Sequence, residues 1–292
     1  MADVVYVTGK GGAGKTTVAA ALALAAAAEG RRAVVCEVGG CHQLASSLSV
    51  APRDALTEWI RTQPGGAVAA AVLSRSPAFA HFIDAAPGAK EVLTIGKVVD
   101  AARTGDYDVV VVDAPSTGHA LGLLAAPGTI AEMASHGPVA RQARELHEYL
   151  CDADRTSYVG VSLPEEMSVR ELLELESGLQ RTLDRRLDLV VVNAMYPDRF
   201  TDAEAQTLLE LAPRDASGRL DAALDEHRKA RAHAARADWL RDRITAPVVA
   251  LPFLFCAEIG PPEYQRLARC LCAADDGLET VLAPDLLAAH AS

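Results

Sequence analysis

Aromatic side chains and excess positive charge are both scarce in this chain of 292 residues. Phe, Trp and Tyr make up 4% of the sequence, and 39 Asp and Glu residues outnumber 28 Lys and Arg residues, which gives a formal net charge of −11. Nucleic-acid surfaces need clustered Lys and Arg for the phosphates and often use aromatic rings on which bases stack. The composition therefore argues against a nucleic-acid partner.

Cysteine pairs, long apolar runs and linkers are also missing. None of the six cysteines stands in a Cys-x-x-Cys pair, so the sequence disfavours a zinc ribbon and a disulfide scaffold. The longest alanine- and leucine-rich stretch has about half of the residues that a membrane-spanning helix needs. The first apolar run begins almost at once, without the basic segment that opens a signal peptide. We expect a cytoplasmic protein.

Six short valine-rich runs alternate with longer helical patterns. The runs lie near residues 4–8, 33–37, 109–113, 156–163, 188–193 and 247–251. Continuous apolar strands separated by helices are typical of a parallel sheet that is covered on both faces. The sequence predicts one α/β domain over residues 1–292, with a doubly wound, mostly parallel sheet, helices on both faces and a short helical subregion around 125–155.

The first run leads into a glycine-rich segment with the pattern of a phosphate-binding loop. Residues 9–16 read Gly-Lys-Gly-Gly-Ala-Gly-Lys-Thr and precede an alanine-rich helical run at 18–28. Glycines permit close approaches that a β-carbon would block, so successive amides can surround phosphate oxygens. The following helix directs its unpaired N–H groups and positive dipole end at the same anion. The segment therefore predicts a P-loop NTPase.

Separate roles are expected for the residues of this loop. Lys15 should contact the β- and γ-phosphates, and Thr16 should offer its hydroxyl oxygen to the Mg²⁺ that bridges them. The other predicted cofactor-binding residues surround the phosphates: Gly11, Gly12, Ala13, Gly14 and, at the α-phosphate, Thr17. The predicted cofactors are ATP and Mg²⁺.

A second motif follows the valine run at 109–113. This run ends in Asp113 and continues as Ala-Pro-Ser-Thr-Gly-His to His119. A carboxylate at the carboxyl end of a parallel strand is placed to hold a magnesium-bound water, and the loop after it could sense the γ-phosphate. Asp113 is therefore the second predicted magnesium contact, through water. The alternative is an aspartate that ends the strand without binding a ligand.

Together the two motifs resemble those of the arsenical-pump and tail-anchored-protein-targeting ATPases. The loop has the Lys-Gly-Gly-x-Gly-Lys-Thr form of the deviant Walker A motif, which MinD and ParA share. Residues 113–119 resemble the pattern Asp-Thr-Ala-Pro-Thr-Gly-His, whose Thr-Gly-His end MinD and ParA lack. The resemblance implies a dimeric ATPase in which Lys10 reaches the nucleotide of the facing subunit, as an arginine finger does in trans. A solvated surface lysine is the alternative.

At the switch I position the chain departs from that family, which carries an aspartate followed by Pro-Ala-His. Here Glu37 is followed by Val-Gly-Gly-Cys-His. By resemblance Glu37 orients the attacking water, although its extra methylene moves the oxygens outward by roughly a bond length. Slow or partner-dependent hydrolysis is one consequence, and a purely structural glutamate is the alternative.

The resemblance also implies a base site. The family places an asparagine after a strand, where it reads the adenine edge through two hydrogen bonds, and Asn193 occupies that place. The loop after a later strand covers the base in the family, so Pro252 and Phe253 are candidates. An aromatic residue after a strand is more often part of the core.

Partners and clients stay open at this stage. Helical spacing at Val139, Ala143, Leu146 and Leu150, and a second apolar stretch at 68–83, could line a groove for a hydrophobic protein client or membrane partner, with core packing as the alternative. The resemblance leaves three functions: escort of membrane-destined proteins, the soluble ATPase subunit of an arsenite or anion efflux pump, and a poorly hydrolysing regulatory switch. The dimer could be a homodimer or a heterodimer with a paralogous ATPase.

Overall fold

A seven-stranded parallel sheet forms the centre of the computed structural model, which describes residues 3–38, 47–50, 88–134, 136–215, 217–274 and 278–282. The strand order is β3-β2-β4-β1-β5-β6-β7. The strands are β1 (Asp3–Gly9), β2 (Ala33–Val38), β3 (Ser47–Val50), β4 (Val109–Ser116), β5 (Thr156–Ser162), β6 (Leu189–Met195) and β7 (Val248–Pro252). All six predicted runs are strands, and the predicted parallel α/β fold is confirmed. The strand β3 was not predicted.

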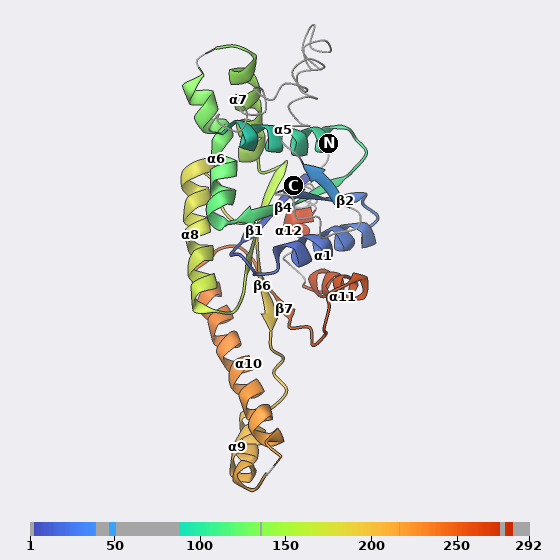
Figure 1. The fold of residues 1–292 in the computed structure, drawn as a ribbon, viewed down its shortest axis with the longest axis vertical. Coiled ribbons are helices and arrows are strands. Elements are labelled where there is room, and N and C mark those ends of the chain that lie inside the picture. Colours follow the sequence, from blue (N-terminus) through green and yellow to red (C-terminus); the bar gives the residue numbers. More distant parts are fainter. Residues whose placement is uncertain are drawn as a thin grey trace, which may run out of the picture.

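Alternate residues of β1 face two separate hydrophobic cores. Val4 and Tyr6 belong to one core, and Val5 and Val7 belong to the other. The first core is completed by α5 (Ala89–Arg103), α6 (Thr117–Met133), α7 (Pro138–Cys151), α8 (Glu166–Leu183) and the end of α10 (Arg219–Arg241). The second is completed by α1 (Lys15–Ala28), α11 (Pro261–Cys272) and α12 (Glu279–Leu282). Figure 1 shows α6 and α8 on the opposite side of the sheet from α1 and α11, so the helices cover both faces.

The alanine-rich helix α1 follows the glycine loop and packs against the sheet and α11. Alanine has the highest helix propensity, and its small side chain lets a helix lie close to its neighbours. Its buried residues include Val18, Ala21, Leu22 and Ala25. Close packing fixes the start of α1 against the carboxyl end of β1, where the predicted phosphate site lies.

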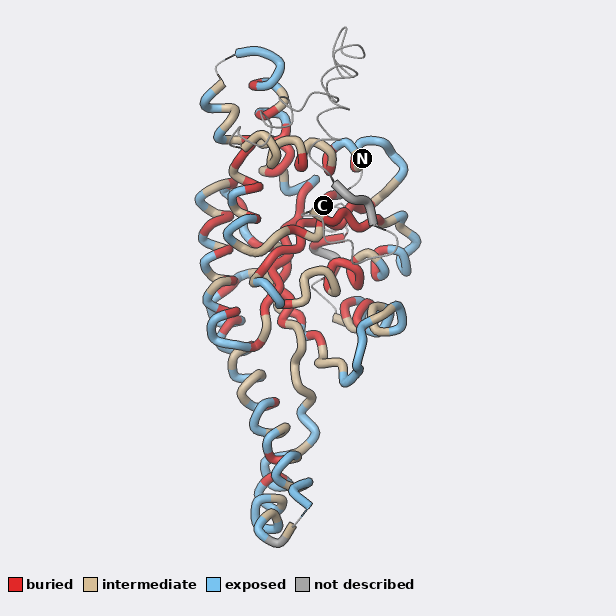
Figure 2. Tube along the Cα trace, in the orientation of Figure 1, coloured by how far each residue is buried: buried red, intermediate tan, exposed pale blue. Residues whose placement is uncertain are grey.

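Between β6 and β7 the chain forms a projecting arm, which we define as residues 202–241. It contains α9 (Asp202–Leu211), a short 3₁₀ turn (Ala212–Arg214) and α10. In Figure 1 the arm extends beyond the ends of β6 and β7, and Figure 2 shows that most of its length is exposed or half-buried. Stacked rings lie at its base, with Tyr196 and Phe253 centroids 4.9 Å apart. The arm therefore begins beside the predicted base site.

The helical subregion around 125–155 contains the end of α6 and the whole of α7. Ala143, Leu146 and Leu150 are buried, as the helical spacing predicted. Val139 does not pack in the core, because its side chain is 51% exposed and Ala140 is buried beside it. Residues 68–83 lie outside the described residues. Among the helices in the described ranges, none combines the length and the apolar character that crossing a membrane requires.

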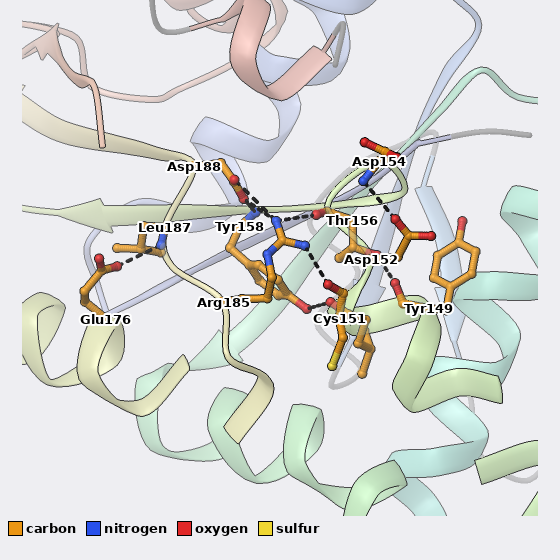
Figure 3. A network of polar contacts seen from close by, with 11 residues as sticks. Tyr149, Cys151, Asp152, Asp154, Thr156, Tyr158, Glu176, Arg185, Leu187 and Asp188 are labelled. Carbon is orange, nitrogen blue, oxygen red and sulfur yellow. Dashed lines mark hydrogen bonds and ion pairs between the residues drawn. The ribbon is translucent and has the colours of Figure 1, made fainter. Parts of the chain in front are cut away.

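At the amino-terminal ends of β5 and β6, a polar network surrounds the buried Arg185 (Figure 3). Its guanidinium donates to the carbonyl oxygens of Thr156, at 3.0 Å, and Cys151, at 3.4 Å, and lies 3.3 Å from both carboxylate oxygens of Asp188. Asp188 also accepts the Tyr158 N–H at 2.7 Å. The Tyr158 hydroxyl in turn donates to a carbonyl of α7 at 2.8 Å. This network joins α7, β5 and the start of β6.

Candidate functional site

The phosphate loop runs from the end of β1 to the first turn of α1, and two of its glycines are needed for steric reasons. Gly9 lies so close to the neighbouring strand that a Cβ there would overlap the Val161 carbonyl oxygen. Gly14 precedes α1 with φ of 88°, a left-handed conformation that other residues rarely adopt. A Cβ on Gly14 would also overlap the Asn193 side chain. The loop therefore turns tightly against β5 and β6.

Thr16 and Asp113 come together at the start of α1, although 97 residues separate them in the chain. The Thr16 hydroxyl donates to Asp113 Oδ2 at 2.6 Å. Burial raises the pKa of Asp113; the Thr16 hydrogen bond and the Lys15 ammonium oppose this effect, and the neighbouring Glu37 adds to it. A hydroxyl and a carboxylate are hard oxygen ligands of the kind that Mg²⁺ takes. The two predicted magnesium contacts are thus adjacent, and their chemistry fits the ion.

Glu37 lies beside Asp113 on the neighbouring strand. The two are register partners in the parallel pairing of β2 with β4, and Glu37 is 3% exposed. Two carboxylates on adjacent strands repel each other, so they make this edge of the sheet favourable for a cation. The structure describes β2 only to Val38, and the switch I residues 39–42 lie outside the described residues.

The side chain of Lys15 lies over its own loop. Its ammonium donates to the Lys10 carbonyl oxygen at 3.3 Å, and the Ala13 N–H donates to the same oxygen at 3.2 Å. Burial lowers the pKa of Lys15, and the nearby Asp113 carboxylate partly opposes this effect. Among the described residues the Lys10 carbonyl is the one acceptor for this half-buried ammonium, which is therefore suited to an anionic ligand at the loop. Thr17, next to Thr16, is half-buried in the first turn of α1.

Lys10 contacts Glu171 of α8, a residue that the sequence did not predict as a partner. The Lys10 ammonium lies 3.4 Å from Glu171 Oε1, and about a third of each side chain is exposed. No local signal could have identified this pair, because the packing of α8 beside β1 brings the two residues together. In this structure Lys10 therefore makes an ion pair within its own subunit.

Asn193 lies at the end of β6 and reaches the phosphate loop. Its Nδ2 donates to the Ala13 carbonyl oxygen at 3.0 Å, and its Oδ1 accepts the Ala194 N–H at 2.9 Å. Ala194 has a positive φ of 59°, and the pairing of β6 with β7 is irregular between Val192 and Met195. The structure thus places the predicted base-reading residue against the loop that should hold the phosphates.

Pro252 and Phe253 end β7 next to this strand. Pro252 is the register partner of Met195, and the Phe253 N–H donates to the Met195 carbonyl oxygen at 2.8 Å. The Phe253 ring stacks on Tyr196, and the Phe255 ring lies edge-on to it with centroids 4.9 Å apart. Phe253 therefore packs at the base of the arm while remaining half-buried.

The segment that follows Asp113, residues 114–119, which we call the switch II segment, differs from the predicted loop. The strand β4 continues past Asp113 to Ser116, and α6 begins at Thr117. The pairing of β1 with β4 shifts between Val7 and Gly9, where Gly9 meets Ser116, and the buried Thr8 hydroxyl donates to the Pro115 carbonyl oxygen at 3.2 Å. The segment after Asp113 is thereby tied to the strand that leads into the phosphate loop.

Comparison with known families matches two parts of the chain to one family. Residues 2–60 and 69–137 match the anion-transporting ATPase family. These ranges contain the phosphate loop, Glu37 and the segment that follows Asp113.

Individual relatives extend this similarity. The chain is 32% identical to ATPase BagA of Mycobacterium tuberculosis over 221 residues, which are 65% of this chain and 64% of that protein. It is 23% identical to ATPase get3 of Pyrenophora tritici-repentis over 218 residues, 66% of this chain and 60% of that one. It is 27% identical to the ATPase ASNA1 homolog of Trypanosoma cruzi over 143 residues, 37% and 40% of the two chains. The chain thus spans just under two thirds of the length of BagA.

Proposed function

Because the chain belongs to the family of the anion-transporting ATPases, we propose that it binds ATP with Mg²⁺, hydrolyses it and uses the nucleotide to switch a dimer between open and closed states. The contact between Thr16 and Asp113 at the end of the glycine loop supports this function most directly. It joins the phosphate-binding segment to the switch II segment with the oxygen ligands that a magnesium–nucleotide needs.

In this proposal the loop residues bind and orient the triphosphate. The amides of Gly11, Gly12, Ala13 and Gly14 surround the phosphate oxygens, and Lys15 leaves the Lys10 carbonyl to contact the β- and γ-phosphates. Thr17 lies in the same first turn of α1 and contacts the α-phosphate. Bound magnesium would neutralise charge that develops on the transferring phosphoryl group, and Thr16 and, through water, Asp113 would hold it.

Glu37 is the proposed water-orienting group. It lies beside Asp113, so it is at the edge of the sheet where the γ-phosphate would sit. Its near-complete burial supports slow hydrolysis in the isolated subunit, because a buried carboxylate has little access to the attacking water before the site closes. Adenine would lie between Asn193 and the Pro252–Phe253 segment, which occupy neighbouring strands.

Lys10 is the proposed contact across the dimer. It supplies positive charge to the nucleotide of the facing subunit, where the transferring group becomes more negative. To do so it must leave Glu171, and the partial exposure of both side chains makes this exchange inexpensive. Either a second copy or a paralogous ATPase can supply the facing site.

The client is proposed to be a hydrophobic, membrane-destined protein. Two exposed apolar side chains support this: Met133 at the end of α6 is 80% exposed, and Val139 at the start of α7 is 51% exposed. The name of the family supports a second candidate, the ATPase subunit of an anion efflux pump. Stimulation of ATP hydrolysis by a hydrophobic peptide would favour the first function, and stimulation by arsenite would favour the second. The free cysteines in the described ranges suit the cytoplasm, where we place the reaction.

The primary test is magnesium-dependent ATP hydrolysis and the molecular mass of the purified chain in ATP and in ADP. We expect hydrolysis, a larger mass in ATP, and loss of ATP binding in Lys15→Ala because the β- and γ-phosphate contact is removed. The control is Arg266→Ala, which removes an exposed cation on α11 and should behave as the wild type. Equal ATP affinity of Lys15→Ala and the wild type would contradict the proposed site.

A further inference from the structure

We propose that Asn193 has a second role beyond base reading: its side chain braces the phosphate loop and thereby joins the base half of the site to the phosphate half. This inference rests on the proposed ATP site. It begins from the 3.0 Å hydrogen bond that Asn193 Nδ2 donates to the Ala13 carbonyl oxygen, between residues 180 positions apart. Ala13 is 1% exposed, so loss of this donor would remove a hydrogen bond from a buried carbonyl.

The amide of Asn193 can perform both roles at once. An asparagine side chain has two N–H donors and an oxygen with two lone pairs. The loop carbonyl takes one donor, and the Ala194 N–H takes one lone pair. One donor and one lone pair remain, and these are what a bidentate contact to an adenine edge requires. The brace therefore need not break when the base binds.

The backbone around Asn193 is shaped to hold this orientation. Ala194 adopts a left-handed conformation, which is unfavourable for an alanine and persists only where the surroundings favour it. The Ala194 N–H, on the peptide bond that joins the two residues, donates to Asn193 Oδ1, and the left-handed residue coincides with the irregular pairing of β6 and β7. The side-chain amide is thus fixed by its own backbone before any ligand is bound.

The phosphate loop is shaped to receive the amide. The nearest heavy atom to a Cβ built on Gly14 is Asn193 Nδ2, and the two would overlap. Among the described residues, the Asn193 side chain is the only group that a Cβ on Gly14 would meet. The glycine immediately before α1 therefore makes room for Asn193 as well as for phosphate. A nucleotide whose base engages Asn193 would act on the same side chain that fixes the loop.

Inorganic tripolyphosphate separates the two roles, because it carries the phosphates without the base. We would measure the affinities of ATP and of tripolyphosphate with Mg²⁺ by calorimetry, for the wild type and for Asn193→Ala and Asn193→Asp. Both variants lose the donor to Ala13, and Asn193→Asp keeps the oxygen that accepts the Ala194 N–H. We expect tripolyphosphate to bind roughly tenfold more weakly to both variants, and ATP to lose more than tripolyphosphate.

Gln206→Ala is the matched control, since it removes an exposed amide on the arm and should leave both affinities unchanged. Wild-type affinity of both Asn193 variants for tripolyphosphate, with weakened ATP binding, would overturn the brace and leave base reading intact. Failure of the wild type to bind either ligand would instead overturn the ATP site itself. Thermal unfolding checks that each variant is folded; if Asn193→Ala is not, the comparison is made with Asn193→Asp alone.

The same experiment includes a readout that a merely structural role would not change. A general loss of stability would lower the affinities for ATP and for GTP equally. If Asn193 has both roles, Asn193→Ala should lower the affinity for ATP more than the affinity for GTP. It should also lower the affinity for tripolyphosphate. An unchanged ratio of ATP to GTP affinity would contradict base reading by the braced side chain.

Discussion

Two polar clusters lie at opposite ends of the central strands, and they differ in how fully their groups are paired. At the amino-terminal end, Arg185 donates to two carbonyl oxygens and one carboxylate, and Asp188 accepts from a backbone N–H as well (Figure 3). At the carboxyl end, within the described part of the chain, the Lys15 ammonium donates to one carbonyl oxygen and Asn193 retains an unused donor and lone pair. The groups of the first cluster are already paired and leave little hydrogen-bonding capacity for a ligand, whereas the second cluster keeps donors and a lone pair that a ligand can use.

Positive φ outside glycine occurs at both clusters, at Asp184 (φ 53°) before Arg185 and at Ala194 (φ 59°) after Asn193. Aspartate tolerates this conformation at the end of a helix better than alanine does. The carboxyl end contains Gly12, Gly14 and Ala194 at positive φ, and of these Ala194 has a side chain that disfavours the conformation. Conformations of this kind concentrate at functional sites, where the surrounding structure holds them. Saturated hydrogen bonding thus indicates a structural role, and unsaturated groups on a strained backbone indicate binding. Each prediction below changes one side of this comparison.

The largest effect is expected for Lys10→Ala, which removes a charge from the binding cluster. Hydrolysis should fall by roughly a thousandfold, the range of a cation supplied in trans, while ATP affinity stays near that of the wild type. ATP-dependent dimerisation should also be lost. Steady-state hydrolysis, calorimetry and mass measurement check the three expectations.

Mixing two inactive variants distinguishes action in trans from action in cis. A dimer of Lys10→Ala with Asp113→Asn has one site that combines an intact Asp113 with Lys10 from the other subunit. The Lys10→Ala homodimer lacks both lysines, but the mixed dimer keeps one, so at protein concentrations at which the mixed dimer forms an equal mixture should regain up to roughly a quarter of the wild-type rate. A mixture as inactive as its components would show that Lys10 acts within its own subunit.

The next largest effect is expected for Arg185→Met in the structural cluster. Removing one partner of a buried ion pair leaves Asp188 and two carbonyl groups without their donor, so the free energy of unfolding should fall by about 3 kcal/mol. ATP affinity of the folded protein should be unchanged. Urea denaturation and calorimetry measure the two quantities, and Arg181→Met, on the exposed surface of α8, is the control. A loss of ATP affinity without a loss of stability would reverse the roles that we assign to the clusters.

The difference between the clusters also explains what the sequence could predict. The glycine loop and the valine runs are local patterns, so the strand and helix on either side of the loop, six strands and the overall architecture followed from neighbouring residues. The short β3 lacks a long apolar run and was missed. The Arg185 network was missed as well, because its partners come from α7, β5 and the start of β6 and only the fold assembles them.

Tertiary contacts account for the site residues that were incompletely predicted. Lys10 and Asn193 were identified from their motifs, but their partners in this structure, Glu171 and Ala13, were not. Each partner lies more than 150 residues away, and nothing in either motif specifies it. Val139 lies in the first turn of α7, where the helical pattern continues but the core does not, so the spacing alone could not choose between the core and the surface.

A smaller effect, an increase in the free energy of unfolding, is expected for Asp113→Asn. Burial raises the pKa of Asp113, so the folded protein holds this proton more tightly than the unfolded chain does. Wild-type stability should therefore fall as the pH rises from about 4 through the raised pKa, and the variant should lack this part of the decrease. At neutral pH we expect the variant to be more stable by about 1 kcal/mol, with weakened magnesium-dependent hydrolysis. Thermal unfolding of both proteins without nucleotide, from pH 4 to pH 8, measures the difference. A variant less stable than the wild type at neutral pH would contradict a destabilising buried carboxylate.

The smallest effect is expected for Glu171→Gln, which tests whether the ion pair in the subunit restrains Lys10. A pair with this exposure contributes less than about 1 kcal/mol, so its loss should increase ATP-dependent dimerisation by roughly two- to fivefold. Glu174→Gln removes the same charge from an exposed position on α8 and controls for net charge. Added salt should reduce the difference between Glu171→Gln and the wild type, because it screens the pair that only the wild type contains. Equal dimerisation of the two glutamine variants at low salt would show that Lys10 is not held back by Glu171, and that the cost of closing the dimer lies elsewhere in the binding cluster.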